Sequence, residues 1–339
     1  MSDRTAVSPL PLQQDNHSLV KAAGVIGIAT FSSRVLGFIR DMVLARLFGA
    51  TPAADAFYVA FRIPSLLREL FAEGSMSAAF IPVFTEYQSR KSKQEAWELA
   101  SAAFTTLLTI VTLVTLVGIL TAPWLVQLLA PGFYSSPGKL ALTTLLARVM
   151  FPYLLFISLA AMAMGILNSV RAFAVPAYAA LFLNIFIIGC ALFLSPHLGE
   201  PILGVAIGVV AGGVAQFVMQ LPSLKVRGLL FGFRFEPGHP GVKRIGQLMV
   251  PSLLGMSVTQ VNLTISTILA SFIAGAPTYL FYGMRLIQFP LGIFGVALAM
   301  AILPTLSAQA TRGAMEELRA TLGFGLRMIV FIMFPAMLG

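Results

Sequence analysis

Long apolar stretches make up most of this sequence, and short polar segments separate them. A helix needs about 20 mostly apolar residues to cross the hydrocarbon core of a bilayer. On that rule we identify nine candidate membrane-spanning runs, approximately at 19–48, 53–86, 96–129, 140–167, 173–194, 202–224, 248–274, 278–308 and 322–338. The pattern therefore predicts an all-α fold, a polytopic membrane helix bundle.

Helix-breaking residues lie inside three of these runs. Pro64 and the pair Glu73-Gly74 fall within the second run, Pro152 falls within the fourth, and Pro290 and Pro304 fall within the eighth. Proline bends a helix and frees a backbone carbonyl, and such breaks persist in lipid only where protein or water satisfies the freed group. We therefore expect broken helices beside a polar cavity, as in transporters.

The longest hydrophilic connector, 225–247, divides the chain into two unequal parts. We predict an N-terminal six-helix lobe over 19–224, a cytoplasmic linker over 225–247 and, over 248–339, about three helices that begin a second lobe. When the chain is shifted by 226 residues, Gly49-Ala50 falls on Gly275-Ala276 and Pro64 falls on Pro290. This match favours a pseudo-symmetric repeat, in which the second lobe is incomplete and the chain looks C-terminally truncated.

Residues 1–18 are mostly polar and lack the basic, apolar and small-residue segments of a signal peptide. We predict that they form a disordered cytoplasmic tail. The orientation follows from the positive-inside rule, because Lys139 is the one basic residue in the predicted outer loops. The predicted cytoplasmic segments contain Arg4, Lys21, Arg90, Lys91, Lys93, Arg171, Lys225, Arg227, Arg234, Lys243, Arg244, Arg312 and Arg319.

Composition excludes several classes of function. Only 10% of the residues are charged, against about 25% in soluble domains. The net charge of +9 would suggest a nucleic-acid partner in a soluble chain, but the cytoplasmic loops account for it here, so we expect no nucleic acid. One cysteine and three scattered histidines make a metal site improbable. No phosphate-binding loop or catalytic motif is visible, so we expect neither an enzyme nor a cofactor.

Charged residues inside the first two runs are the strongest functional signal. Arg34, Arg40 and Asp41 lie in the middle of the first run, in S-R-V-L-G-F-I-R-D. Placing one arginine at the bilayer centre costs about 2.5–3.5 kcal/mol on insertion scales. The second run adds a stripe with heptad spacing that includes Asp55 and Arg62, with Arg68 beside it. Two interpretations remain: a hydrated cavity for an anionic substrate, or ion pairs that only join helices.

Arg285 lies in Y-G-M-R-L-I-Q-F-P-L-G, and neither the seventh nor the eighth run contains an acid. Its partner must therefore come from another helix or from a ligand. Arginine suits phosphate because its planar, permanently charged group presents a fork of donors. A cavity lined by Arg34, Arg40, Arg68 and Arg285 would suit a diphosphate.

At these residues the chain resembles the MurJ (MviN) family of lipid II flippases. The resemblance rests on S-R-V-L-G-F-I-R-D at 33–41, G-A-x-x-A-A-D-A-F-Y-V-A-F-R-I-P-S-L-L-R at 49–68, A-E-G at 72–74, A-P-G-F at 130–133, and Arg285 with Gln288-Phe289-Pro290. It implies the fold of the multidrug/oligosaccharidyl-lipid/polysaccharide exporter superfamily, with two pseudo-symmetric lobes. It also implies a multi-pass protein of the bacterial cytoplasmic membrane.

The resemblance further implies a function and a site. The expected substrate is a lipid-linked diphosphate oligosaccharide, the undecaprenyl-linked peptidoglycan precursor, which moves from the inner to the outer leaflet by alternating access. Arg40, Asp41 and Arg285 would lie near the membrane portal, while Arg34, Asp55 and Arg68 match further functional positions. Membrane lipids and other cell-wall synthesis proteins are expected partners. Some relatives carry acids at the places of Met284 and Gln288, so Arg285 is freer here to meet an anion.

Two alternatives stay open at this point. One is an exporter of another polyprenyl-linked oligosaccharide or of a drug. The other is a non-transporting membrane scaffold in which the charges only pair helices.

Overall fold

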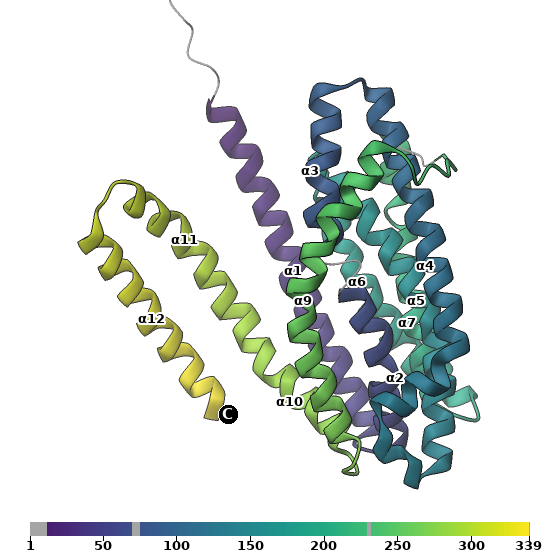
Figure 1. The fold of residues 1–339 in the computed structure, drawn as a ribbon. Helices are drawn as coiled ribbons and strands as arrows, with labels where there is room; N and C mark the ends of the chain where they lie inside the picture. Colours follow the sequence, from purple (N-terminus) through teal and green to yellow (C-terminus); the bar gives the residue numbers. More distant parts are fainter. Residues whose placement is uncertain (1–11, 70–74, 229–231, 339) are drawn as a thin grey trace, which may run out of the picture.

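The structure is a computed structural model, and it describes residues 12–69, 75–228 and 232–338. Regular secondary structure in this part of the chain is helical, which confirms the predicted all-α bundle (Figure 1). The α-helices are α1 (Leu12–Phe48), α2 (Pro52–Arg68), α3 (Ser75–Arg90), α4 (Lys93–Leu129), α5 (Pro137–Ser169), α6 (Ala174–Gly189), α7 (Ile202–Val218), α8 (Leu221–Val226), α9 (Pro240–Ala270), α10 (Ala276–Pro290), α11 (Val296–Thr311) and α12 (Met315–Leu338).

Shorter helical segments connect some of these elements. A 3-10 turn, η2 (Pro131–Ser135), follows α4, and a π-helical segment, η3 (Cys190–Leu194), continues α6 into a second 3-10 turn, η4 (Ser195–His197). A second π-helical segment, η5 (Leu291–Gly295), joins α10 to α11. It directly follows Pro290, where the sequence predicts a broken helix.

Helix α5 is the centre of the N-terminal bundle and packs against α2, α4 and α7. Its side chains Phe151 and Tyr153 are almost fully buried. Glycines on the neighbouring helices make room for both rings: a Cβ on Gly213 of α7 would lie 2.7 Å from Tyr153 Cδ2, and a Cβ on Gly118 of α4 would overlap the Phe151 ring. Small residues therefore allow the close helix approach that packing within a membrane requires.

Five described helical segments are long and apolar enough to cross a membrane, and the two halves of α9, which meet at a 46° bend, would make a sixth. The sequence predicts nine runs. The second run is divided between α2 and α3, and the eighth is divided among α10, η5 and α11, so each half is shorter than a full span. Residues 70–74, which include the predicted break at Glu73-Gly74, lie outside the described residues.

The structure bears on the predicted N-terminal tail and on the suggested repeat. Helix α1 begins at Leu12, so residues 12–18 are helical and the prediction of a disordered tail is wrong for them; residues 1–11 lie outside the described part. The suggested repeat is supported at its turns. Gly49 and Gly275 both adopt left-handed backbone conformations, with φ of 56° and 76°, where α1 turns into α2 and α9 turns into α10.

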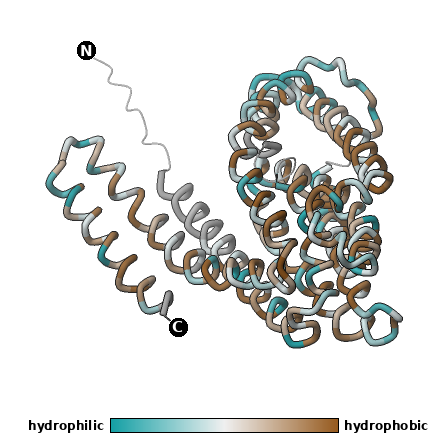
Figure 2. Tube along the Cα trace, turned by 60° about the horizontal axis from the view of Figure 1, so that its bottom comes forward, coloured by the Kyte–Doolittle hydropathy of each residue, from teal (hydrophilic) through white to brown (hydrophobic). Residues whose placement is uncertain are grey.

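Helices α11 and α12 pack against each other and extend away from the main bundle (Figure 1). Hydrophilic residues gather at the turns between helices, while long helical surfaces are hydrophobic (Figure 2). On α4, Leu113, Leu116 and Leu120 are exposed. Such surfaces suit contact with lipid, where apolar side chains face an apolar solvent.

Candidate functional site

Arg40 and Asp41 form a buried ion pair on α1. Arg40 Nη2 lies 2.6 Å from Asp41 Oδ1, and Arg40 Nε donates to the same oxygen at 2.9 Å. Arg40 Nη1 donates to Asn184 Oδ1 on α6 at 3.0 Å, and Asn184 Nδ2 donates to the carbonyl of Ser33 at 3.3 Å. These bonds offset the cost of burying both charges, so α6 fixes the two side chains in place.

Arg285 of α10 lies near the other oxygen of the same carboxylate. Its Nε lies 3.4 Å from Asp41 Oδ2. Its Nη1 donates to Gln288 Oε1 at 3.4 Å, and its guanidinium carbon lies 5.1 Å from the centroid of the Phe281 ring. Of the two sources that the sequence left open for a partner of Arg285, another helix or a ligand, the structure shows an acid on another helix, Asp41. Because one carboxylate faces two guanidinium groups, positive charge remains in excess here.

These groups line a cavity of about 650 Å³ whose walls come from α1, α2, α5, α6, α7 and α10. The structure brings the four predicted arginines to this one cavity. Asp41 is the single carboxylate among its lining residues in the described part of the chain. The arginines are Arg34, Arg40, Arg68 and Arg285, and uncharged polar lining residues include Asn184, Gln216, Gln220 and Gln288.

In the part of the chain that the structure describes, Arg34 differs from Arg40 and Arg285 in its lack of polar partners. Within the described residues it forms no hydrogen bond or ion pair, and its side chain is exposed. Its guanidinium lies against Gly292 in η5, so closely that a Cβ at that position would overlap it. Arg34 therefore keeps its donors available to an anion in the cavity.

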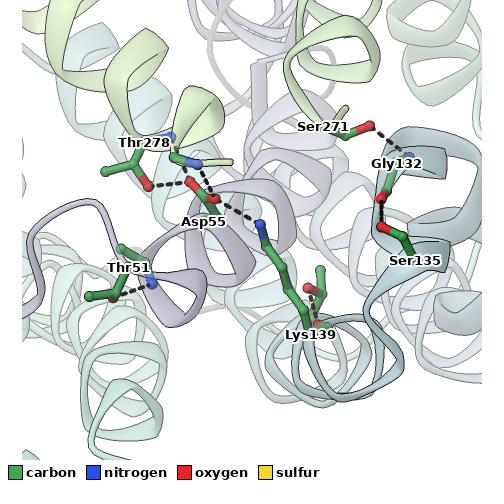
Figure 3. Close-up of polar contacts among 10 residues, drawn as sticks. Thr51, Asp55, Gly132, Ser135, Lys139, Ser271 and Thr278 are labelled. Carbon is green, nitrogen blue, oxygen red and sulfur yellow. Dashed lines mark hydrogen bonds and ion pairs between the residues drawn. The ribbon is translucent and has the colours of Figure 1, made fainter. Parts of the chain in front are cut away.

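Asp55 does not line the cavity but joins the beginnings of two helices (Figure 3). Its carboxylate, 1% exposed, accepts hydrogen bonds from Lys139 Nζ at 2.7 Å, from Gly275 N at 2.9 Å, and from both the hydroxyl and N–H of Thr278, at 2.6 and 3.1 Å. A residue of α2 thus caps the first turn of α10. Lys139, the lone basic residue of the predicted outer loops, neutralises the Asp55 carboxylate.

A second contact joins the same end of the molecule. Gly132, in the A-P-G-F motif of η2, donates its N–H to Ser271 Oγ at 3.0 Å at the end of α9 (Figure 3). A Cβ at Gly132 would lie 2.6 Å from Phe272 N and would overlap the Ser271 carbonyl. Only glycine therefore permits this approach between the N-terminal bundle and α9.

Arg62 also lies apart from the cavity lining. Its Nη2 donates to Gln260 Oε1 on α9 at 3.0 Å, and Gln260 Nε2 in turn donates to Glu69 Oε2. Although Asp55 and Arg62 have heptad spacing on one helix, they form no ion pair within the described residues, because the Asp55 carboxylate is bound by Lys139 and α10. Arg62 therefore connects α2 to α9 through a glutamine.

Sequence reasoning missed the uncharged members of these networks. Asn184, Gln260 and Thr278 are polar residues inside apolar runs. Their position there is the one feature of the sequence that could have pointed to them. Their partners come from distant helices, so spacing along one helix gives no indication of which groups they bind. The sequence pattern marks Lys139 only as the one basic residue of the predicted outer loops and does not indicate its pairing with Asp55.

Comparison with known proteins gives a consistent result. The family model described as lipid II flippase MurJ matches residues 44–339. The chain is 42% identical over 329 residues to a probable lipid II flippase MurJ of Vibrio cholerae, and 39% identical over 326 residues to the lipid II flippase MurJ of Burkholderia cenocepacia. Both alignments cover 95% of this chain and 63% of the relative, so the chain spans less than two thirds of their length.

Solved structures agree with the sequence relatives. A lipid II flippase MurJ in an inward closed conformation superposes with a TM-score of 0.76 and 28% identity, covering 92% of this chain and 64% of that one. A multidrug transporter of the MATE family, in an outward-facing conformation, superposes with a TM-score of 0.63 at 16% identity, covering 92% and 70%; it shows a shared fold. The chain belongs to the lipid II flippase MurJ family.

Proposed function

We propose that this protein binds the diphosphate of a polyprenyl-linked peptidoglycan precursor in its arginine-lined cavity and turns the headgroup from the cytoplasmic to the outer leaflet. The observation that carries the proposal is the charge of the cavity. Four arginines line it beside a single lining carboxylate, Asp41. A diphosphate supplies the missing negative charge, and its oxygens match the guanidinium forks.

The family likeness supports this choice of substrate, because the named relatives are lipid II flippases. The biased distribution of basic residues supports an N-terminus in the cytoplasm and a location in the bacterial cytoplasmic membrane. With that orientation, the turn between α1 and α2 lies on the outer side. The prenyl tail stays in lipid while the headgroup enters the protein.

The contacts of Asp55 hold α2 and α10 together at the outer end of the protein. Asp55 lies in the first turn of α2 and Arg68 is its last residue, and 13 residues of helix separate them by about 20 Å. The cavity arginine therefore lies near one end of α2, while the other end is bound to α10 through Thr278. Alternating access requires these outer contacts to break when the cavity opens outward.

A flipping assay tests the proposal. The protein is reconstituted into liposomes with a fluorescent precursor, and the fraction of headgroups accessible from outside is followed with time. Arg40→Ala and Arg285→Ala are expected to abolish flipping while membrane insertion and helix content stay unchanged. Competition by unlabelled precursor, but not by a cationic drug, is expected to slow the wild-type reaction.

The same variants separate transport from a purely structural role. If the charges only pair helices, alanine at Arg40 lowers thermal stability and leaves the rate per folded protein unchanged. Full flipping by both folded alanine variants would contradict the proposal.

A further inference from the structure

Two glutamines on the α7 side of the cavity contain carbonyl oxygens that lack hydrogen-bond partners. Gln216 and Gln220 are 8% and 2% exposed, and both line the cavity. In the described part of the chain, the Oε1 atom of each is buried and accepts no hydrogen bond. Buried carbonyl oxygens are nearly always paired, so two unpaired ones at the wall of one cavity indicate a missing donor.

The orientation of the Gln220 amide is fixed by its nitrogen. Nε2 donates to the carbonyl of Ala160 at 3.1 Å and to the carbonyl of Gln216 at 3.0 Å. Exchanging nitrogen and oxygen would place Oε1 against two carbonyl oxygens, so the assignment is determined by the network. Oε1 is therefore an acceptor that the protein leaves unused.

Gln216 lies near the end of α7, and Gln220 lies in the turn between α7 and α8, where its amide nitrogen donates to the Gln216 carbonyl. Within the described residues no hydrogen bond holds the Gln216 amide, so it is free to turn its oxygen toward the cavity. The cavity lining also includes Ala160, Ala161 and Ala180, and the Ala160 carbonyl contacts the Gln220 amide. These small side chains leave space in the chamber.

The charge of the cavity decides which donor fits. A cation would meet the excess of guanidinium groups over carboxylates already described, and an anion would meet carbonyl oxygens at this wall. A neutral hydroxyl or amide N–H meets neither difficulty. The arginines thus offer donors, and Gln216 and Gln220 offer acceptors, within one chamber.

We propose that Gln216 and Gln220 form an acceptor subsite that binds hydroxyl or amide N–H groups of the sugar–peptide part of the precursor, while the arginines bind its diphosphate. The inference rests on the proposed function and adds a second point of recognition to it. A carrier lipid that ends at the diphosphate would contact the arginines of the cavity but not Gln216 and Gln220.

The test compares two lipids on purified protein. Undecaprenyl diphosphate presents the diphosphate alone, and the undecaprenyl-diphosphate-linked disaccharide pentapeptide adds hydroxyls and amides; Kd for each is measured by microscale thermophoresis. Gln216→Met keeps the length of the side chain and removes the acceptor. It is expected to weaken the disaccharide lipid about three- to ten-fold and to change undecaprenyl diphosphate less than two-fold. Gln216→Leu repeats the comparison with a second apolar side chain.

Gln309→Met is a matched control, because Gln309 is also buried with an unpartnered Oε1 but lies on α11 away from the cavity. It is expected to leave both affinities unchanged. If Gln216→Met changes the Kd of both lipids equally, or changes neither, the proposed subsite is wrong. A bound water would then be the partner of these oxygens. Arg40→Ala separates the two hypotheses: if it fails to weaken undecaprenyl diphosphate, the proposed function is wrong.

Discussion

Thr278 of α10 binds the Asp55 carboxylate of α2 with two groups, its hydroxyl at 2.6 Å and its backbone N–H at 3.1 Å. A helix usually receives such a cap from its own chain segment, whereas here the cap comes from a residue far away in sequence. Breaking this contact therefore uncaps one helix and separates two at the same time.

Asp55→Asn is expected to lower stability strongly. The amide removes the charge that faces Lys139, and removing one partner of a buried ion pair costs about 3–5 kcal/mol. Lys139 is itself only 12% exposed. Thermal unfolding in detergent measures the loss, and spin labels at the starts of α2 and α10 are expected to report a longer distance. In a double-mutant cycle, Lys139→Met is expected to recover part of the loss; strictly additive effects would show that the pair is not coupled.

Gly132→Ala is expected to weaken the contact between η2 and α9. The added methyl group would overlap the Ser271 carbonyl, and such overpacking costs about 1–3 kcal/mol. The melting temperature and a spin-label distance from η2 to the end of α9 measure the effect. Gly138→Ala is the control, since a Cβ there meets nothing within 4 Å. Equal melting temperatures for the two variants would argue against a tight contact at Gly132.

Arg285→Lys is expected to weaken binding of undecaprenyl diphosphate about ten-fold or more, because lysine keeps the charge but loses the donor fork. Raising the salt concentration is expected to reduce this affinity in the wild-type protein. Arg148→Lys is the control, since Arg148 donates to the Ile119 carbonyl and does not line the cavity. An unchanged Kd for Arg285→Lys would mean that bidentate contact at this position is not needed.

Gln260→Leu is expected to affect stability rather than binding. It removes the acceptor of Arg62 and the donor to Glu69, and an unsatisfied buried polar group costs about 1–3 kcal/mol. The melting temperature is expected to fall while the Kd for undecaprenyl diphosphate stays constant. Gln94→Leu, at an exposed position where the amide contacts Glu98, is expected to change neither quantity.

The sequence predicted the cavity arginines because a charge inside an apolar run has a visible cost. Arg34, Arg40 and Arg285 therefore stand out without any structure, and they do meet at one cavity. The sequence did not separate Asp55 and Arg62 from these cavity residues, because all of them are charged residues inside an apolar run. Their different positions depend on which distant helix supplies the partner, Lys139 for one and Gln260 for the other.

Uncharged polar residues were harder to find than charged ones. Gln216 and Gln220 add little cost to an apolar run, so composition does not single them out. Pro64 predicted a break in the second run, but it lies inside α2, which continues to Arg68, and the run is divided only after that residue, between α2 and α3. The two short helices pack against α5 and α9. The local pattern thus indicated that the second run is divided, but Pro64 did not mark the place.

The π-helical turn η5 has a geometric consequence for the end of the chain. Such a turn usually accommodates one extra residue in an α-helix, and each residue advances an α-helix by about 100°. The faces of α11 are therefore rotated by that amount relative to an uninterrupted continuation of α10. The direction in which the α11–α12 hairpin leaves the bundle (Figure 1) is accordingly sensitive to an insertion or deletion of a single residue within 291–295.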